Sequence, residues 1–149
     1  MKQNTKRRGG FTLLELVIAL AVATIISGGV FMTFRQTPQR VLRSAALQMQ
    51  ADIRYAQRRA MIEGRRIQVS FYPTGRMYRI RFYDTLEELR RVYLQDGISL
   101  LTHYLPSNRM TYLPRGTVSD AGSITLSMDG FTQRLTITPA SGRVILLDT

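Results

Sequence analysis

The hydrophobic positions of this 149-residue chain follow three successive patterns. In the first, residues 11–34 are almost wholly apolar, and Glu15 is their single charged residue. As an α-helix rising about 1.5 Å per residue, this stretch would be about 36 Å long, which exceeds the ~30 Å hydrocarbon core of a bilayer. Residues 11–34 are therefore predicted to form a transmembrane helix.

The second pattern, in residues 35–64, has the period of an amphipathic helix. Gly64 is expected to end this helix as a left-handed cap. Half of the residues of the apolar stripe are alanines, so we expect it to lie on a sheet rather than in a coiled coil. One long helix from about 11 to 63 is predicted, interrupted or bent near Pro38. The stripe comprises Leu42, Ala46, Met49, Ile53, Ala56 and Ala60.

Three residues weaken this long helix where it would leave the membrane. Gly28 and Gly29 stand late in the apolar segment, and Pro38 lies just beyond it. Glycine disfavours a helix interior by about 1 kcal/mol relative to alanine, and proline by about 3 kcal/mol. We expect either a flexible point between residues 28 and 38 or close helix packing at Gly28.

In the third pattern, from residue 65 onward, apolar and polar residues alternate as in strands. Residues 67–71 and 78–82 flank Pro73-Thr74-Gly75 and predict a hairpin. Residues 92–94 and 98–101 flank Asp96-Gly97 and predict a second one. Residues 85–88 could instead open a helical turn as a capping box, but a strand preceded by a loop is favoured.

The C-terminal part predicts a meander of three strands. These are residues 123–128, 132–138 and 144–147, joined by turns at Asp129-Gly130 and Ser141-Gly142. Residues 103–122 contain two prolines and two glycines and are expected to be mostly loop. The predicted fold class is α+β, with a long helix packed on an antiparallel β-sheet.

Composition leaves little material for catalysis. The chain has no cysteine, which excludes disulfides, thiolate metal sites and cysteine nucleophiles, and it has one histidine. His103 lacks the sequence partners of a catalytic triad or a zinc site. Glu87-Glu88 before Arg90-Arg91 is interpreted as a solvated charge run, and no glycine-rich phosphate-binding motif occurs. We expect no enzymatic activity, no catalytic residue, no metal and no cofactor.

The basic start of the chain predicts its orientation. Residues 1–10 carry four Lys or Arg and no acid, so they should stay cytoplasmic and leave the chain after Arg35 outside. A cleaved secretory signal ending at Ala21-Val22-Ala23 is an alternative, but cleavage there would leave an exposed apolar start. A plain signal anchor does not explain Glu15, because a lone acid in the membrane costs at least about 2 to 3 kcal/mol.

The run Gly10-Phe11-Thr12-Leu13-Leu14-Glu15, preceded by two arginines and followed by the apolar segment, resembles the processing site of type IV prepilins and type II secretion pseudopilins. The resemblance implies cleavage between Gly10 and Phe11 by a prepilin peptidase and N-methylation of Phe11. It also implies a single-pass protein of the inner membrane with its head outside. Later the protein would enter a filament at the cell surface or in the periplasm.

The resemblance divides the chain into four parts: a leader (1–10), a transmembrane and assembly helix (11–34), its amphipathic continuation (35–64) and a β-rich head (65–149). The Gly116–Gly122 segment and the closing SGRVILL resemble the H-type (FimT-like) minor pseudopilins. The implied role is structural, in a type IV pilus, a competence pilus or a type II secretion pseudopilus. Implied partners are other pilins, the peptidase, the inner-membrane assembly platform and lipid. A membrane-anchored protein outside any filament is the alternative.

A second functional hypothesis comes from charge. The chain carries 21 basic and 10 acidic residues, for a net charge of +11, and every basic residue after position 10 is arginine. Arg79 and Arg81 alternate on one predicted strand and share a face, which could grip DNA phosphates while a tyrosine stacks on bases. The same face could instead be solvated or contact acidic neighbouring pilins. The candidate DNA contacts are Arg65, Arg66, Arg76, Arg79, Arg81, Tyr83, Arg134 and Arg143.

The resemblance to pilins predicts a specific effect of removing the Glu15 carboxylate. In a water-excluding filament core a buried charge needs a partner, and the Phe11 amine is the candidate. We expect Glu15→Leu or Glu15→Ala to leave cleavage and membrane insertion intact but to impair entry into the filament, as measured by immunoblotting of sheared filaments. Normal incorporation of the Glu15→Leu protein would contradict this role.

Overall fold

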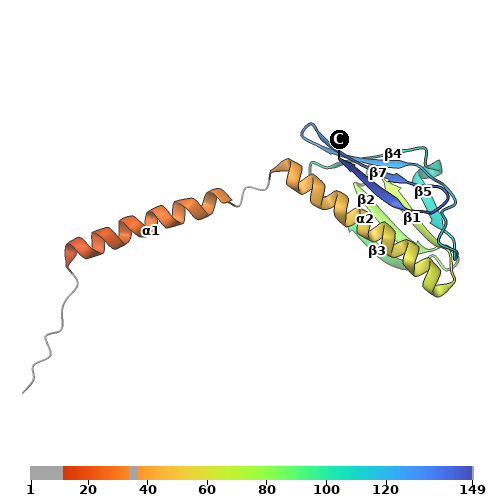
Figure 1. Cartoon of the computed structure of the whole chain (residues 1–149), viewed down its shortest axis with the longest axis horizontal. Coiled ribbons are helices and arrows are strands. Elements are labelled where there is room, and N and C mark those ends of the chain that lie inside the picture. The colour runs from red at the N-terminus through yellow and green to blue at the C-terminus, as the bar shows by residue number, and fades with distance from the viewer. Residues whose placement is uncertain (1–11, 34–36, 149) are drawn as a thin grey trace, which may run out of the picture. The chain divides into compact units, whose positions relative to one another are not determined.

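The computed structural model describes residues 12–33 and 37–148, and its elements are labelled in Figure 1. The chain divides into two compact units, an N-terminal one and a head that begins at Thr37. Gly10 and Phe11, the expected cleavage site, lie outside the described residues. The buried core residues of the described chain all lie between Val41 and Val144, so the head has a hydrophobic core of its own.

The N-terminal unit contains the helix α1 (Leu13–Thr33). The Thr12 hydroxyl accepts a hydrogen bond from the Glu15 backbone N–H at 3.3 Å, as at a helix N-cap. Glu15 lies in the first turn, where the helix dipole favours negative charge. Within the described ranges, no helix meets the combined requirements of length and apolar character for crossing a bilayer.

The head begins with α2 (Pro38–Glu63), which has proline at its first position and Gly64 as its C-cap. Gly64 has φ 62°, so the predicted left-handed cap is confirmed. All six residues of the predicted apolar stripe are buried. The helix expected over 11–63 is thus present as α1 and α2, and residues 34–36 between them lie outside the described residues.

Two four-stranded antiparallel sheets complete the head. Sheet A has the strand order β3-β2-β1-β5, and sheet B has the order β4-β6-β7-β8. Helix α2 contacts β1 and β5 of sheet A and β6, β7 and β8 of sheet B, so it covers both sheets (Figure 1). The strands are β1 (Ile67–Tyr72), β2 (Met77–Phe82), β3 (Glu88–Tyr93), β4 (Ser99–His103), β5 (Arg109–Tyr112), β6 (Ser123–Met128), β7 (Phe131–Ile137) and β8 (Val144–Asp148).

The first predicted hairpin and the C-terminal meander are confirmed. β1 pairs with β2, and β6, β7 and β8 pair in succession, all antiparallel. In the β1–β2 turn the left-handed residue is Arg76 (φ 45°) rather than Gly75. Residues 84–87 form turn and loop rather than helix, as favoured from the sequence.

The predicted hairpin around Asp96-Gly97 is wrong. β3 pairs with β2 in sheet A, whereas β4 pairs with β6 in sheet B, so this turn passes the chain from one sheet to the other. Gly97 has φ 88° and makes the reversal, as its sequence signal indicated. Turn chemistry specifies a change of direction, but long-range contacts choose the strand on which the next segment pairs.

The expectation of loop for most of residues 103–122 is also corrected. The segment contains a 3₁₀ turn (Pro106–Asn108) and the strand β5, which pairs with β1. Met110 and Tyr112 of β5 are fully buried, and the Tyr112 hydroxyl donates to the Gly142 carbonyl oxygen at 2.9 Å. A four-residue strand between proline-rich flanks is too short to show alternation in the sequence.

Asp52 is a buried carboxylate in α2 that the sequence reasoning missed. It is 1% exposed and accepts hydrogen bonds from the Tyr78 hydroxyl (2.6 Å to Oδ2) and the Gln48 amide (3.1 Å to Oδ1). Arg90 of β3 forms an ion pair with Oδ1. Burial, followed by the hydrogen bond to Asp52, raises the pKa of Tyr78 above its ordinary value, so the phenol remains a donor. The network joins α2 to β2 and β3.

Replacing Asp52 by alanine should strongly destabilise the head. The change removes the acceptor of the buried Tyr78 hydroxyl and the counter-charge of Arg90, and we expect the free energy of unfolding to fall by roughly 2 to 3 kcal/mol. Urea denaturation of the head followed by circular dichroism measures this. The matched control is Asp96→Ala, which breaks the exposed pair with Arg76 and should change stability far less. Equal losses in the two variants would contradict a structural role for the network.

Candidate functional site: the outer face of sheet A

The side of sheet A opposite its buried core carries two of the predicted arginines, Arg79 and Arg81. On β2, Tyr78, Ile80 and Phe82 are buried, so Arg79 and Arg81 point to the other side and share a face as predicted. Cross-strand register adds residues from β1, β3 and β5. We call this surface the outer face of sheet A; its residues are Gln68, Ser70, Tyr72, Met77, Arg79, Arg81, Glu88, Arg91, Tyr93, Arg109 and Thr111.

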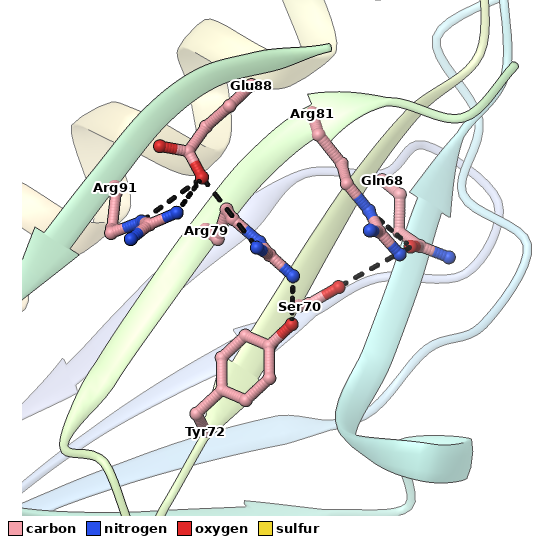
Figure 2. Close-up of polar contacts among 7 residues, drawn as sticks. All are labelled: Gln68, Ser70, Tyr72, Arg79, Arg81, Glu88 and Arg91. Atoms are coloured by element: carbon pink, nitrogen blue, oxygen red, sulfur yellow. Dashed lines mark hydrogen bonds and ion pairs between the residues drawn. The ribbon is translucent and has the colours of Figure 1, made fainter. Parts of the chain in front are cut away.

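The two β2 arginines are held by neighbours on β1. Arg79 donates from Nη2 to the Tyr72 hydroxyl oxygen at 2.6 Å, and its guanidinium carbon lies 5.4 Å from the Tyr72 ring centroid. Arg81 donates from Nε (3.1 Å) and Nη2 (2.8 Å) to Gln68 Oε1 (Figure 2). These contacts fix both guanidinium groups in a partly buried layer on the sheet.

Glu88 is the carboxylate of this face. Arg91 approaches Glu88 Oε2 through Nη2 at 2.7 Å and through Nε at 3.1 Å, and Arg79 Nη1 lies 3.7 Å from the same oxygen (Figure 2). The hydrogen bond to Glu88 raises the pKa of Arg91 from its ordinary value. Because the face has arginines at 79, 81, 91 and 109 against this one carboxylate, it keeps a net positive charge.

The other predicted residues near this end of the head already have partners. Arg65 stacks on Phe82, with 3.9 Å from its guanidinium carbon to the ring centroid. Arg66 stacks on Tyr83 at 4.2 Å and forms an ion pair with Asp84 at 2.9 Å. Arg76 pairs with Asp96 at 2.8 Å. One face of the Tyr83 ring is therefore covered by Arg66 rather than open to a base.

Arg134 and Arg143 do not extend the outer face of sheet A, contrary to the sequence expectation. Arg134 is exposed on β7 of sheet B, where its register partners are Thr125 and Leu147. Arg143 precedes β8 and lines a hollow with Arg54 and Arg58 of α2. Alternation along a strand predicts the side on which a residue lies, but it does not predict the sheet to which the strand belongs.

Of the aromatic and cationic residues of the face, Tyr72, Arg91, Tyr93 and Arg109 were missed by sequence reasoning. They could be assigned to the face only once β3 and β5 were placed on β2 and β1. With four arginines and one carboxylate, the face has the charge that would favour an anion. In the part of the chain that the structure describes, no group of His, Asp and Glu side chains is arranged to hold a metal ion.

Solved structures similar to this one come from two filament systems. The minor pseudopilin EpsH of the Vibrio cholerae type II secretion system aligns with a TM-score of 0.65 at 14% identity, over 75% of this chain and 96% of EpsH. The type IV minor pilin FimU of Pseudomonas aeruginosa aligns with a TM-score of 0.59 at 19% identity, over 71% of this chain and 87% of FimU. At these identities the likeness establishes the fold, and the predicted α+β pilin-like class is confirmed.

Family models match both units. The model described as prokaryotic N-terminal methylation motif matches residues 5–31, and the model described as type II transport protein GspH matches residues 45–142. A comparison with curated protein sequences gives no match. Since the GspH model spans well over half of the chain, including most of α2 and most strands of both sheets, the protein belongs to the GspH family of minor pseudopilins.

Proposed function

We propose that this chain is made as a membrane-held precursor and works as a minor structural subunit of a filament: a type IV pilus, a competence pilus or a type II secretion pseudopilus. The observation that carries the proposal is the surface of α1. The side chains described for α1, residues 13–24, are exposed; they are apolar except for Thr24 and for Glu15, the one charged residue among them. Such a surface needs lipid or other apolar helices to cover it. The exposed apolar residues include Leu13, Leu14, Leu16, Val17, Ile18, Leu20 and Val22.

The apolar surface of α1 accounts both for how the precursor is held in the membrane and for how the mature subunit packs in the filament. In the inner membrane, lipid covers α1, the basic leader stays inside and the head lies outside. Prepilin peptidase cuts between Gly10 and Phe11, and the new Phe11 amine, once methylated, still carries a positive charge. When the assembly platform moves the helix among those of other pilins, this amine pairs with the Glu15 carboxylate of its own or a neighbouring subunit. The pair compensates both charges and fixes the axial register of the subunit.

Mass spectrometry of the protein from its native cells tests the processing step. The mature chain should begin at N-methylated Phe11, and a bulky substitution such as Gly10→Val should leave the leader attached, because the peptidase site is altered. Glu15→Leu serves as the matched control and should still give the Phe11 start. An intact leader on the native protein, or a new N-terminus at Thr24, would contradict the proposal.

A second candidate function, a DNA receptor for uptake, is favoured by the outer face of sheet A. Three of its four arginines, Arg79, Arg81 and Arg91, are fixed in position by Tyr72, Gln68 and Glu88, which suits binding to a phosphate chain. Tyr93 at the edge of the face is 66% exposed and could stack on an unpaired base. This function would add to the structural role, since both use the head outside the membrane.

A gel-shift experiment with the head, residues 35–149, tests DNA binding. At low salt we expect a shift with single-stranded DNA that weakens at least about tenfold in Arg79→Glu with Arg81→Glu, because two phosphate contacts are lost and two repulsions replace them. The control, Arg40→Glu with Arg43→Glu, changes the net charge equally on α2 and should retain binding. The receptor idea is wrong if the head does not bind DNA or if both double variants lose binding equally.

A further inference from the structure

The solvent side of α2 carries a stripe of four arginines, with two apolar residues between them, that spans most of the helix. Its members are spaced three or four residues apart, so they lie on one helix face, and all are exposed. From first to last they extend about 27 Å at 1.5 Å per residue. The cationic stripe comprises Arg40, Arg43, Leu47, Ala51, Arg54 and Arg58.

Two hollows lie along this stripe and meet at Ala51. One is lined by Arg40, Arg43 and Leu47 together with neighbouring polar residues of α2. The other lies between Arg54 and Arg58 of α2 and the start of β8, where Arg143 and Val144 form its second wall. Ala51 lines both hollows, and together they are called the α2 groove, which has arginines at both ends and Leu47 and Ala51 at its centre.

No carboxylate of the described chain forms an ion pair with Arg54, Arg58 or Arg143. The two acids of α2 are engaged elsewhere, because Asp52 is buried on the opposite side and Glu63 pairs with Arg59 at 2.6 Å. Arg54 donates from Nη2 to the Val144 carbonyl oxygen at 3.4 Å, which directs its side chain along the groove. Like charges one turn apart on a helix repel each other, and an acidic partner would relieve this repulsion.

We propose that this groove binds an acidic amphipathic segment of another protein. Carboxylates of that segment pair with the arginines at the two ends, and a small apolar side chain lies on Leu47 and Ala51 between them. Leu47 is 47% exposed, so its contact adds apolar burial to the ion pairs. The binding surface itself follows from the head alone, and only the partner's identity as a neighbouring filament subunit rests on the proposed function.

The chemistry of the groove favours a protein segment over nucleic acid. The groove has no aromatic side chain for base stacking, and its apolar centre has no counterpart in a phosphate chain. It also disfavours a second copy of this chain, whose net charge is +11. Most carboxylates of the head already contact an arginine of their own chain: Asp52, Glu63, Asp84, Glu88 and Asp96. The partner is therefore a different and acidic protein.

Fluorescence anisotropy with the head, residues 37–149, tests the surface directly, because that unit contains the whole described core. The probe is a synthetic amphipathic helix with two glutamate clusters separated by Leu and Ala. Arg54→Glu with Arg58→Glu should weaken its binding at least about tenfold, since attraction becomes repulsion at one end of the groove. The control Arg109→Glu with Arg134→Glu changes the charge equally on the two sheets and should shift the dissociation constant by no more than about twofold.

Further binding measurements distinguish between the possible ligands of the groove. A probe with lysine in place of glutamate should bind the Arg54→Glu, Arg58→Glu head better than the native head. Arg54→Gln with Arg58→Gln provides a milder variant if charge reversal prevents folding, and it should still weaken binding a few-fold. The proposal is overturned if a 20-nucleotide single strand or vesicles with anionic lipid bind the groove in preference to the peptide, or if both double variants lose binding equally.

Photo-crosslinking in cells tests the partner. A photoreactive residue at position 47 or 51 of the full chain should crosslink to an acidic segment of a different filament subunit, and Arg54→Glu with Arg58→Glu should abolish the product while processing to Phe11 continues. Crosslinks only to other copies of this chain, or no crosslink, would overturn the partner assignment. If the peptide binds but the native chain is never processed to Phe11, the proposed filament role is wrong, whereas the proposal that the groove binds an acidic segment is retained.

Discussion

The packing of α2 across both sheets is the constraint on which the head depends. Neither sheet has a second layer of its own, and the buried stripe from Leu42 to Ala60 supplies the surface on which both meet. Small side chains in that stripe allow the strands to approach closely. Asp52 is the one carboxylate in this contact, and its donors from α2, β2 and β3 compensate the loss of hydration. The same helical period that buries one face of α2 turns the cationic stripe toward solvent.

The two cationic surfaces of the head differ in shape and chemistry, although both are built from arginine. On the outer face of sheet A, the guanidinium groups of Arg79, Arg81 and Arg91 contact Tyr72, Gln68 and Glu88, which hold them in place. In the α2 groove, Arg54, Arg58 and Arg143 lie at one end of an apolar centre and have no acidic partner in the described chain. The first surface suits a flat, extended polyanion, and the second suits an acidic segment with an apolar centre.

The two units of the chain differ in the character of their surfaces. Residues 13–24 of α1 present a nearly uniform apolar surface with one carboxylate in the first turn, a pattern that suits packing among similar helices. The head shares its fold with EpsH and FimU at 14% and 19% identity, so a similar fold is reached with largely different residues. Among the charged residues of this head, arginines outnumber the acids.

The sequence by itself determined the elements that depend on local pattern: the buried stripe of α2, the Gly64 cap, the β1–β2 hairpin, the meander and the shared face of Arg79 and Arg81. Periodicity and turn chemistry act within a few residues, so they can be read from the chain. Only the tertiary structure decided that β3 and β4 part into different sheets, that β5 joins β1, that Asp52 meets Tyr78 and that Arg143 lies beside α2. Each of these pairs residues distant in the sequence, and their partners are chosen by which apolar faces remain to be covered once the helix and sheets have packed.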